Sequence, residues 1–134
     1  MGDSCGLMPF KKYFPERFFD VGIAEQHAVT FASGLAKNGM IPVFAVYSTF
    51  FQRSYDQIIH DISLQNVKVV FALDRSGFSG NDGETHQGLF DIPMLLPIPN
   101  IKIYSPSTAT ELEKTLDYAI NVNEQSTVIR YPKD

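Results

Sequence analysis

The chain has 134 residues, of which 44% are hydrophobic and 19% charged, a composition typical of one globular domain rather than of a disordered segment. Asp and Glu outnumber Lys and Arg by 15 to 11, which argues against a protein that binds nucleic acid by neutralising phosphates. The single cysteine, Cys5, excludes an internal disulfide and a cysteine-based zinc cluster, and it suits a reducing compartment. The sequence shows no secretion signal and no apolar run of the roughly 20 residues that span a bilayer, so we expect a cytoplasmic protein without a membrane partner.

Short apolar runs alternate along the chain with segments of helical period. The runs at residues 18–21, 41–47, 67–73, 101–104 and 127–130 predict strands. The run at 41–47 is almost continuously apolar, which is typical of a strand that is covered on both faces. The alternation predicts an α/β fold, with a parallel sheet that carries helices on both faces.

Three intervening segments predict helices. In residues 24–37 the apolar residues recur at steps of three and four. Two further helices open with a capping-box pattern, in which a threonine is followed three residues later by Gln or Glu. These pairs are Thr49 with Gln52 and Thr108 with Glu111. We expect the helix that begins at Thr49 to bury Tyr55 among its apolar residues.

Polar residues cluster where the predicted strands end. In a parallel sheet, ligands bind where the chain leaves the carboxyl ends of the strands. Four segments meet that condition: 22–25, 47–50, 74–86 and 130–131. We therefore expect a functional site at this rim of the sheet.

Glu25 lies in the first turn of the first predicted helix. One interpretation is structural, because the helix dipole favours a carboxylate there. The other is functional: the apolar neighbours Ile23 and Ala28 indicate a setting poor in water, where a carboxyl group can hold and donate a proton near neutral pH. Spacing alone favours the structural interpretation, and both stay open.

Residues 76–88 form the longest polar stretch, with Asp82, Glu84 and His86 close together. The stretch is either a solvated surface loop or a functional one, and long loops in compact domains are more often functional. A metal site is disfavoured because no second His or Cys lies at ligand spacing.

Three arginines follow predicted strands at the same expected rim: Arg53, Arg75 and Arg130. Each alone is typical of a surface residue. Together they are candidates for recognising an anion, since guanidinium forks match phosphate oxygens.

Four motifs are similar to those of the family of 1-deoxy-D-xylulose-5-phosphate synthases. They lie at residues 20–29 (DVGIAEQHAV), 47–57 (YSTFFQRSYDQ), 74–88 (DRSGFSGNDGETHQG) and 130–132 (RYP). The resemblance implies the pyrimidine-binding domain of a thiamine diphosphate-dependent, transketolase-like transferase. Such an enzyme condenses pyruvate with glyceraldehyde 3-phosphate, with loss of carbon dioxide, in non-mevalonate isoprenoid and thiamine biosynthesis. A plant-type source would place it in the plastid stroma.

The resemblance assigns cofactor contacts to three residues. Glu25 matches the glutamate that hydrogen-bonds the pyrimidine ring and exchanges a proton with it, so its expected role is catalytic. Phe50 matches the aromatic residue that stacks on the pyrimidine, and Ile23 a further cofactor contact. This domain would bind the pyrimidine half of thiamine diphosphate, and Mg²⁺ would be held only through another domain.

The resemblance also assigns substrate contacts. Positions that bind the phosphorylated acceptor match Tyr47, Arg53, Arg75 and Arg130. Asp82 and His86 match residues close to the substrate and the reaction intermediates, and His86 is expected to be catalytic.

The resemblance covers about residues 14–134, whereas residues 1–13 match only loosely. We expect the domain that binds the diphosphate through Mg²⁺ to be absent from this chain, because no Gly-Asp-Gly motif occurs, and the C-terminal domain to be absent as well. The chain would then supply half of an active site and be inactive alone. Its expected partners are the missing domain or a second chain, and further copies of itself in a homo-oligomer. Pro93, Leu96 and Pro97 depart from the family pattern, which more often has polar residues there.

Two alternatives stay open. The chain could be the pyrimidine-binding subunit of a split transketolase or the β subunit of a 2-oxoacid dehydrogenase, which share the Gly-Ile-Ala-Glu pattern of residues 22–25. It could also be a non-catalytic assembly module. Against the second alternative stands the joint presence of Glu25, Phe50, Arg53 and His86.

Overall fold

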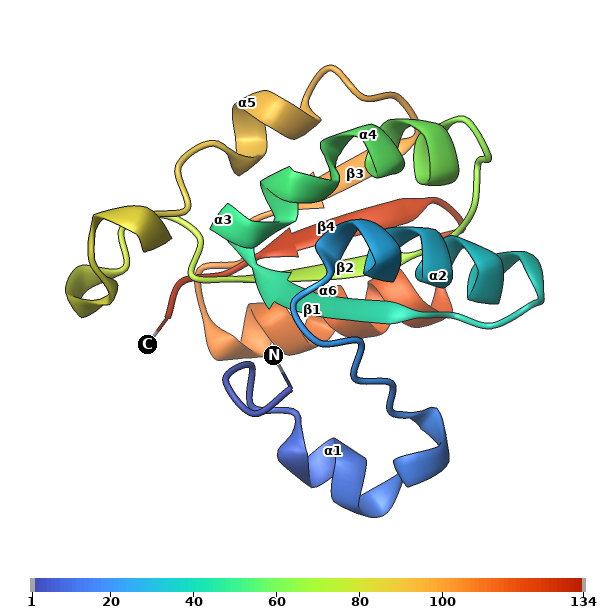
Figure 1. The fold of residues 1–134 in the computed structure, drawn as a ribbon, viewed down its shortest axis with the longest axis horizontal. Helices are drawn as coiled ribbons and strands as arrows, with labels where there is room; N and C mark the ends of the chain where they lie inside the picture. Colours follow the sequence, from blue (N-terminus) through green and yellow to red (C-terminus); the bar gives the residue numbers. More distant parts are fainter. Residues whose placement is uncertain (1, 134) are drawn as a thin grey trace.

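A computed structural model describes residues 2–133. Within them, a four-stranded parallel sheet has the strand order β1-β2-β4-β3 (Figure 1). The strands are β1 (Val43–Tyr47), β2 (Val70–Asp74), β3 (Ile101–Tyr104) and β4 (Ser126–Arg130). The predicted parallel α/β fold is confirmed.

Helices cover both faces of the sheet (Figure 1). One face carries α2 (Glu25–Lys37), the helical segment 48–63 and α5 (Asp91–Leu95), and the other carries α6 (Ala109–Asn121). The helical segment 48–63 is irregular. It consists of α3 (Ser48–Phe51), a 3₁₀ turn (Gln52–Ser54), α4 (Tyr55–Gln57) and a π-helical turn (Ile58–Ser63).

Two apolar cores lie on the two sides of β2. Successive residues of a strand point to opposite faces, so Phe71 and Val70 enter different cores although both are fully buried. Phe71 packs with Val29 of α2 and with Phe51, whose ring centroid lies 4.9 Å from its own. Val70 packs with Ala119 of α6. This two-sided burial fixes β2 in the interior of the sheet.

The strand predicted at residues 18–21 does not form. Phe18 has extended dihedral angles, but within residues 2–133 it pairs with no strand, and Phe19 is 55% exposed. The Gly22 backbone N–H donates to Asp20 Oδ1 (3.0 Å), and Gly22 has a φ of +72°, so a tight turn leads the chain into α2 instead. The expected cover of 41–47 on both faces holds only for the second half of β1, where Val46 and Tyr47 are buried, whereas Val43 at its start is exposed.

Only the second of the two capping-box predictions is confirmed. Glu111 N–H donates to Thr108 Oγ1 (3.2 Å) at the start of α6. Thr49, in contrast, lies inside α3, and its buried hydroxyl has no hydrogen-bond partner in the described part of the chain. Tyr55, expected to be buried, is 38% exposed because the helix tightens into a 3₁₀ turn just before it.

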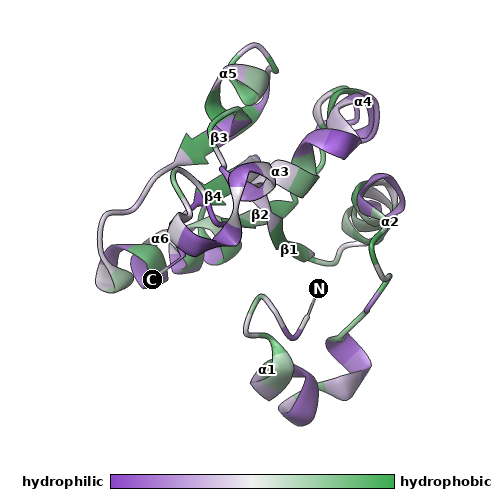
Figure 2. Cartoon of the chain, turned by 60° about the vertical axis from the view of Figure 1, so that its left-hand side comes forward, coloured by the Kyte–Doolittle hydropathy of each residue, from purple (hydrophilic) through white to green (hydrophobic). Residues whose placement is uncertain are grey.

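The helical part of the N-terminal segment, residues 8–17, stands apart from the sheet (Figure 2). It contains α1 (Met8–Tyr13) and a 3₁₀ turn (Pro15–Arg17), neither of which the apolar pattern predicted. Large apolar side chains of this segment are exposed, among them Phe10, Tyr13 and Phe14. Across residues 2–133, every helix is too short or too polar to cross a membrane.

The polar stretch 76–88 is a loop closed at its base. Gly77 and Gly88 exchange two backbone hydrogen bonds, each 2.8 Å long. Between them the chain makes two 3₁₀ turns, Gly80–Asp82 and Glu84–His86. A Cβ atom on Gly88 would lie 2.8 Å from Ser48 Cβ and from Ser76 Cα, and closer still to the Arg75 carbonyl oxygen. The close approach of these backbones therefore requires glycine.

We expect Gly88→Ala to destabilise the protein by at least about 2 kcal/mol, because the clash is with backbone atoms that have little room to move. Urea unfolding measures the change. Gly34→Ala is the matched control: Gly34 is exposed within α2 with open space around its Cβ position, so its substitution should stabilise by about 0.5–1 kcal/mol. Equal effects of the two substitutions would contradict this packing.

Candidate active site at the carboxyl rim of the sheet

The strand register brings the predicted site residues together. β1 and β2 end side by side, with Tyr47 opposite Asp74. The helical segment 48–63 leaves the end of β1, and the loop 75–88 leaves the end of β2. Both segments therefore begin at one rim, as expected for a parallel sheet.

Glu25 is the first residue of α2 and is only 5% exposed, which confirms the predicted water-poor setting. Among residues 2–133 its carboxylate has one ion-pair partner, Arg53, whose Nη1 lies 3.5 Å from both oxygens. This contact is long, and the Arg53 side chain is 54% exposed. The buried carboxylate is thus only weakly engaged within residues 2–133, and its oxygens can accept a hydrogen bond from an incoming group.

Ile23 does not contribute to that burial. Its side chain is 71% exposed, because the turn at Gly22 directs the chain outward before α2 begins. The interpretation of Ile23 as a neighbour that excludes water from Glu25 is therefore wrong. Helix packing provides the burial instead, since Ala28 and Val29 of α2 are almost fully covered.

An aromatic cluster lies beside this carboxylate. Phe50 stacks on Tyr47, with ring centroids 5.2 Å apart and an interplanar angle of 22°. His86, from the loop, meets Phe50 edge-on at 5.3 Å and Tyr47 at 6.1 Å. The Arg53 guanidinium carbon lies 4.8 Å from the Phe50 ring centroid. Residues from β1, the helical segment 48–63 and the loop therefore form one cluster of rings, with His86 at 67° to the two stacked rings.

Arg75 connects the cluster to acidic side chains. Its guanidinium carbon lies 3.8 Å from the Tyr47 ring centroid, and its Nε donates to Asp82 Oδ2 (2.9 Å). A second ion pair joins it to Asp74. Arg75 has a φ of +57°, a left-handed conformation that costs a non-glycine residue about 1 kcal/mol or more. The bond from its N–H to Asp74 Oδ1 (2.7 Å) helps to hold this conformation.

The N-terminal segment reaches this part of the rim. Arg75 Nη1 lies 3.5 Å from the carbonyl oxygen of Ser4. Burial, followed by the charge of Asp74, raises the pKa of the Cys5 thiol. Burial likewise raises the pKa of Tyr131, so both groups stay protonated at neutral pH.

Asp82 and His86 lie on the two 3₁₀ turns of the loop. Asp82 Oδ1 accepts from Lys133 Nζ (2.6 Å), and this bond, with that from Arg75, lowers the pKa of Asp82 below its ordinary value of 3.8. His86 Nδ1 lies 2.9 Å from Thr85 Oγ1. Gln87 braces the loop, since its side chain accepts from Ser79 N–H (2.7 Å) and donates to the Gly83 carbonyl (2.6 Å).

Arg130 lies at the rim but outside the aromatic cluster. At the end of β4 it forms a two-point ion pair with Asp91, Nε to Oδ2 at 2.9 Å and Nη2 to Oδ1 at 3.3 Å. The Asp91 side chain is 1% exposed and that of Arg130 is 16% exposed. The three predicted arginines therefore share the rim but not one cluster.

Four polar residues of this region were not singled out from the sequence: Asp74, Gln87, Asp91 and Lys133. Asp74 and Asp91 carried a signal, because each lies next to apolar residues in the sequence, and an acid that is buried among them needs a partner. With them, four carboxylates face four basic side chains at the rim. The rim is thus close to electrically neutral, and an anion that binds there displaces a carboxylate or uses an exposed donor.

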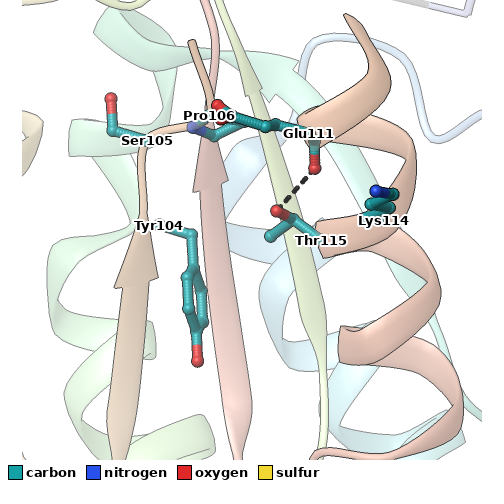
Figure 3. Close-up of a pocket in the computed structure, with 6 residues that line it drawn as sticks. All are labelled: Tyr104, Ser105, Pro106, Glu111, Lys114 and Thr115. Carbon is teal, nitrogen blue, oxygen red and sulfur yellow. Dashed lines mark hydrogen bonds between the residues drawn. The ribbon is translucent and has the colours of Figure 1, made fainter. Parts of the chain in front are cut away.

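A shallow hollow of about 230 Å³ lies away from the aromatic cluster, between the end of β3 and the start of α6 (Figure 3). Its lining residues include Tyr104, Ser105 and Lys114, and Thr115 Oγ1 there donates to the Glu111 carbonyl (2.7 Å). None of the residues predicted for the site lines it. Residues 2–133 also bring no three potential metal ligands together.

We expect Lys133→Ala to raise the pKa of Asp82, because the hydrogen bond from Lys133 is the largest cause of its depression. A lowered pKa means that the Asp82 ion pairs stabilise the fold above pH 3.8 and are lost as pH falls through the lower, folded value. Carboxyl-carbon NMR titration measures it. Lys114→Ala, an exposed lysine on α6, is the control and should leave the titration unchanged, and an unchanged titration in Lys133→Ala would contradict the assignment.

The family model described as "Transketolase, pyrimidine binding domain" matches residues 1–134. The chain is 59% identical over 133 residues to a 1-deoxy-D-xylulose-5-phosphate synthase of Clostridium kluyveri and 56% identical to one of Natranaerobius thermophilus. Each match covers 99% of this chain and 21% of the relative. The chain therefore spans about a fifth of the length of these curated relatives.

Solved structures share the fold. A split-gene transketolase described as an inactive β4 tetramer superposes with a TM-score of 0.81 at 30% identity, covering 92% of this chain and 40% of that one. A transketolase of Campylobacter jejuni gives 0.75 at 21% identity over 86% of this chain and 18% of its own, which supports the fold alone. The whole-length family match, the parallel sheet and these relatives agree: the chain belongs to the transketolase pyrimidine-binding domain family, a domain of thiamine diphosphate-dependent enzymes.

Proposed function

We propose that this chain is the pyrimidine-binding part of a 1-deoxy-D-xylulose-5-phosphate synthase, which condenses pyruvate with glyceraldehyde 3-phosphate and releases carbon dioxide. The high identity to curated synthases over nearly the whole chain supports this activity over that of a transketolase, since the identity is only 30% to the split-gene transketolase and 21% to that of Campylobacter jejuni. The single observation that carries the chemistry is the buried, weakly paired carboxylate of Glu25 beside the aromatic cluster.

The residues of the rim fit the pyrimidine half of thiamine diphosphate. A planar aminopyrimidine needs a stacking surface and a hydrogen-bonding partner, and Phe50 and Glu25 offer these, with Arg53 bridging them. Bound thiamine diphosphate supplies an electron sink for decarboxylation. The exposed Ile23 side chain is free to contact the cofactor as well. Mg²⁺ and the diphosphate would be held by a separate domain, in the same polypeptide or in a second chain.

Glu25 would act by holding a proton at its carboxylate against a ring nitrogen. A carboxylate that is 5% exposed is shielded from competing water, which makes it an effective proton partner. The 3.5 Å contact to Arg53 leaves room for this exchange, because a tight ion pair would fix the carboxylate in its ionised form. His86, with one ring nitrogen beside Thr85, would exchange protons at the substrate.

The phosphorylated acceptor would bind where the basic side chains gather. Arg53 is the most exposed of the three predicted arginines and the least tightly paired, so it can turn to a phosphate at small cost. Arg75 and Arg130 are already held by carboxylates and would act as fixed donors. Tyr47 and Asp82 would line the same region from β1 and the loop.

We also infer self-association. Exposed apolar side chains such as Phe78, Leu96 and Ile23 leave surface that another domain or chain can cover. The split-gene transketolase with the same fold is described as a tetramer, which supports assembly of copies of such a chain.

The proposed function is tested by Glu25→Gln in a complete synthase that carries this domain sequence. Glutamine keeps the hydrogen bond but not the proton, so product formation from pyruvate and glyceraldehyde 3-phosphate should fall by about 10²–10⁴-fold, with an unchanged unfolding midpoint. Glu113→Gln, at an exposed position of α6, is the control and should retain full activity. A Glu25→Gln enzyme with full activity would fit an assembly role and sink the proposal.

A further inference from the structure

We propose that Asp91, which no motif assigns, is a positioning residue for the acceptor phosphate: it fixes the guanidinium of Arg130 so that one edge stays available to the anion. The inference rests on the proposed function, because Arg130 acts there as a hydrogen-bond donor to the phosphate of the acceptor. It adds a residue whose hydrogen bonds go to Arg130 and Ile92 rather than to the aromatic cluster.

The contacts of Asp91 indicate that its carboxylate holds Arg130 in place. Its carboxylate is buried, at 1% exposure, yet it is charged, and a buried charge is retained only where it is paired. Both oxygens are used on Arg130, at 2.9 and 3.3 Å, and Oδ1 also accepts the N–H of Ile92 (2.9 Å). The carboxylate is therefore anchored to its own backbone and can hold a side chain in a set orientation.

Arg130 has one side that Asp91 occupies and one that it leaves open. Nε and Nη2 face the carboxylate, and Nη2 also lies 3.5 Å from the carbonyl oxygen of Gly88 at the base of the loop. Nη1, which carries two N–H groups, makes a single contact in residues 2–133, at 3.3 Å to the exposed hydroxyl of Ser105. The remaining donor capacity of Arg130 is thus concentrated on Nη1, on the more exposed edge of the pair.

A fixed guanidinium binds an anion better than a mobile one, because the side-chain entropy has been lost before the ligand arrives. Arg53 offers the contrast within the same rim: its side chain is 54% exposed, its contacts to Glu25 are long, at 3.5 Å, and its guanidinium also packs on the Phe50 ring. The rim would then combine a mobile arginine, Arg53, with a fixed one, Arg130. The carboxylate of Asp91 sets the orientation of the Arg130 guanidinium.

The test compares two acceptors in a complete synthase: D-glyceraldehyde 3-phosphate and unphosphorylated D-glyceraldehyde. In Asp91→Asn, the kcat/KM for D-glyceraldehyde 3-phosphate divided by that for D-glyceraldehyde should fall by about tenfold. The fall should come from a higher KM for the phosphorylated acceptor, because the Arg130 guanidinium is no longer held by two charged hydrogen bonds. A merely structural role would lower both values together and leave the ratio intact. Asp117→Asn, at an exposed position of α6, is the control for handling and assay.

Asp91→Glu covers the case in which the asparagine variant does not fold. It keeps the charge but moves the carboxylate by one methylene, so the ratio should fall to a value between wild type and the loss expected for asparagine. A charge that served only to neutralise Arg130 would be equally well supplied by glutamate, and an unaltered ratio would overturn the inference.

The experiment distinguishes a failure of the proposed synthase activity from a failure of the proposed role of Asp91. A wild-type enzyme that does not turn over pyruvate with glyceraldehyde 3-phosphate contradicts the proposed function, and the inference falls with it. A wild-type enzyme that does, while Asp91→Asn or Asp91→Glu keeps the wild-type preference for the phosphorylated acceptor, contradicts the inference alone.

Discussion

The parallel pairing of β1 with β2 is the constraint on which the rim depends. Because Tyr47 and Asp74 end the two strands in register, everything that follows them starts from adjacent points. Phe50 comes about one helical turn beyond Tyr47 and Arg53 nearly two turns beyond it. Arg75 comes directly after Asp74, where it lies over the Tyr47 ring at 3.8 Å. A slip of one residue would turn these side chains to the other face of the sheet and separate the aromatic cluster from the loop.

The charges of the rim follow from the same constraint. Parallel strands bring arginines from three strand ends to one edge, and each is matched by at least one carboxylate. The three arginines differ in how tightly they are paired. Arg130 is held at two points by one buried carboxylate, and Arg75 contacts two carboxylates and the Tyr47 ring. Arg53 makes only long contacts to its carboxylate partner. Such a surface is stable without a ligand, because each buried carboxylate of residues 2–133 has a basic partner, and it still retains donors for an anion.

The sequence predicted the fold class, the helices α2 and α6, and all four strands of the sheet, because apolar runs and apolar periodicity report burial directly. It failed where a local pattern was overridden: the apolar residues at 18–21 find no strand to pair with, and Thr49 lies inside a helix instead of capping one. The rim position of Arg130 was predictable, but its partner Asp91 was not, since 39 residues separate them and only packing brings them together. Ile23 was misjudged for a related reason, because a glycine turn decides its exposure.

The central claim is that this rim supplies half of a cofactor site, namely the pyrimidine side. Calorimetric titration of thiamine diphosphate with Mg²⁺ tests it most directly, in the 134-residue chain and in a complete synthase that carries the same sequence. We expect saturable binding to the complete enzyme and no detectable binding to the chain alone, because stacking and one carboxylate offer too little without the diphosphate contacts. Equally tight binding by the chain alone would show that it holds the whole cofactor, and would contradict this account.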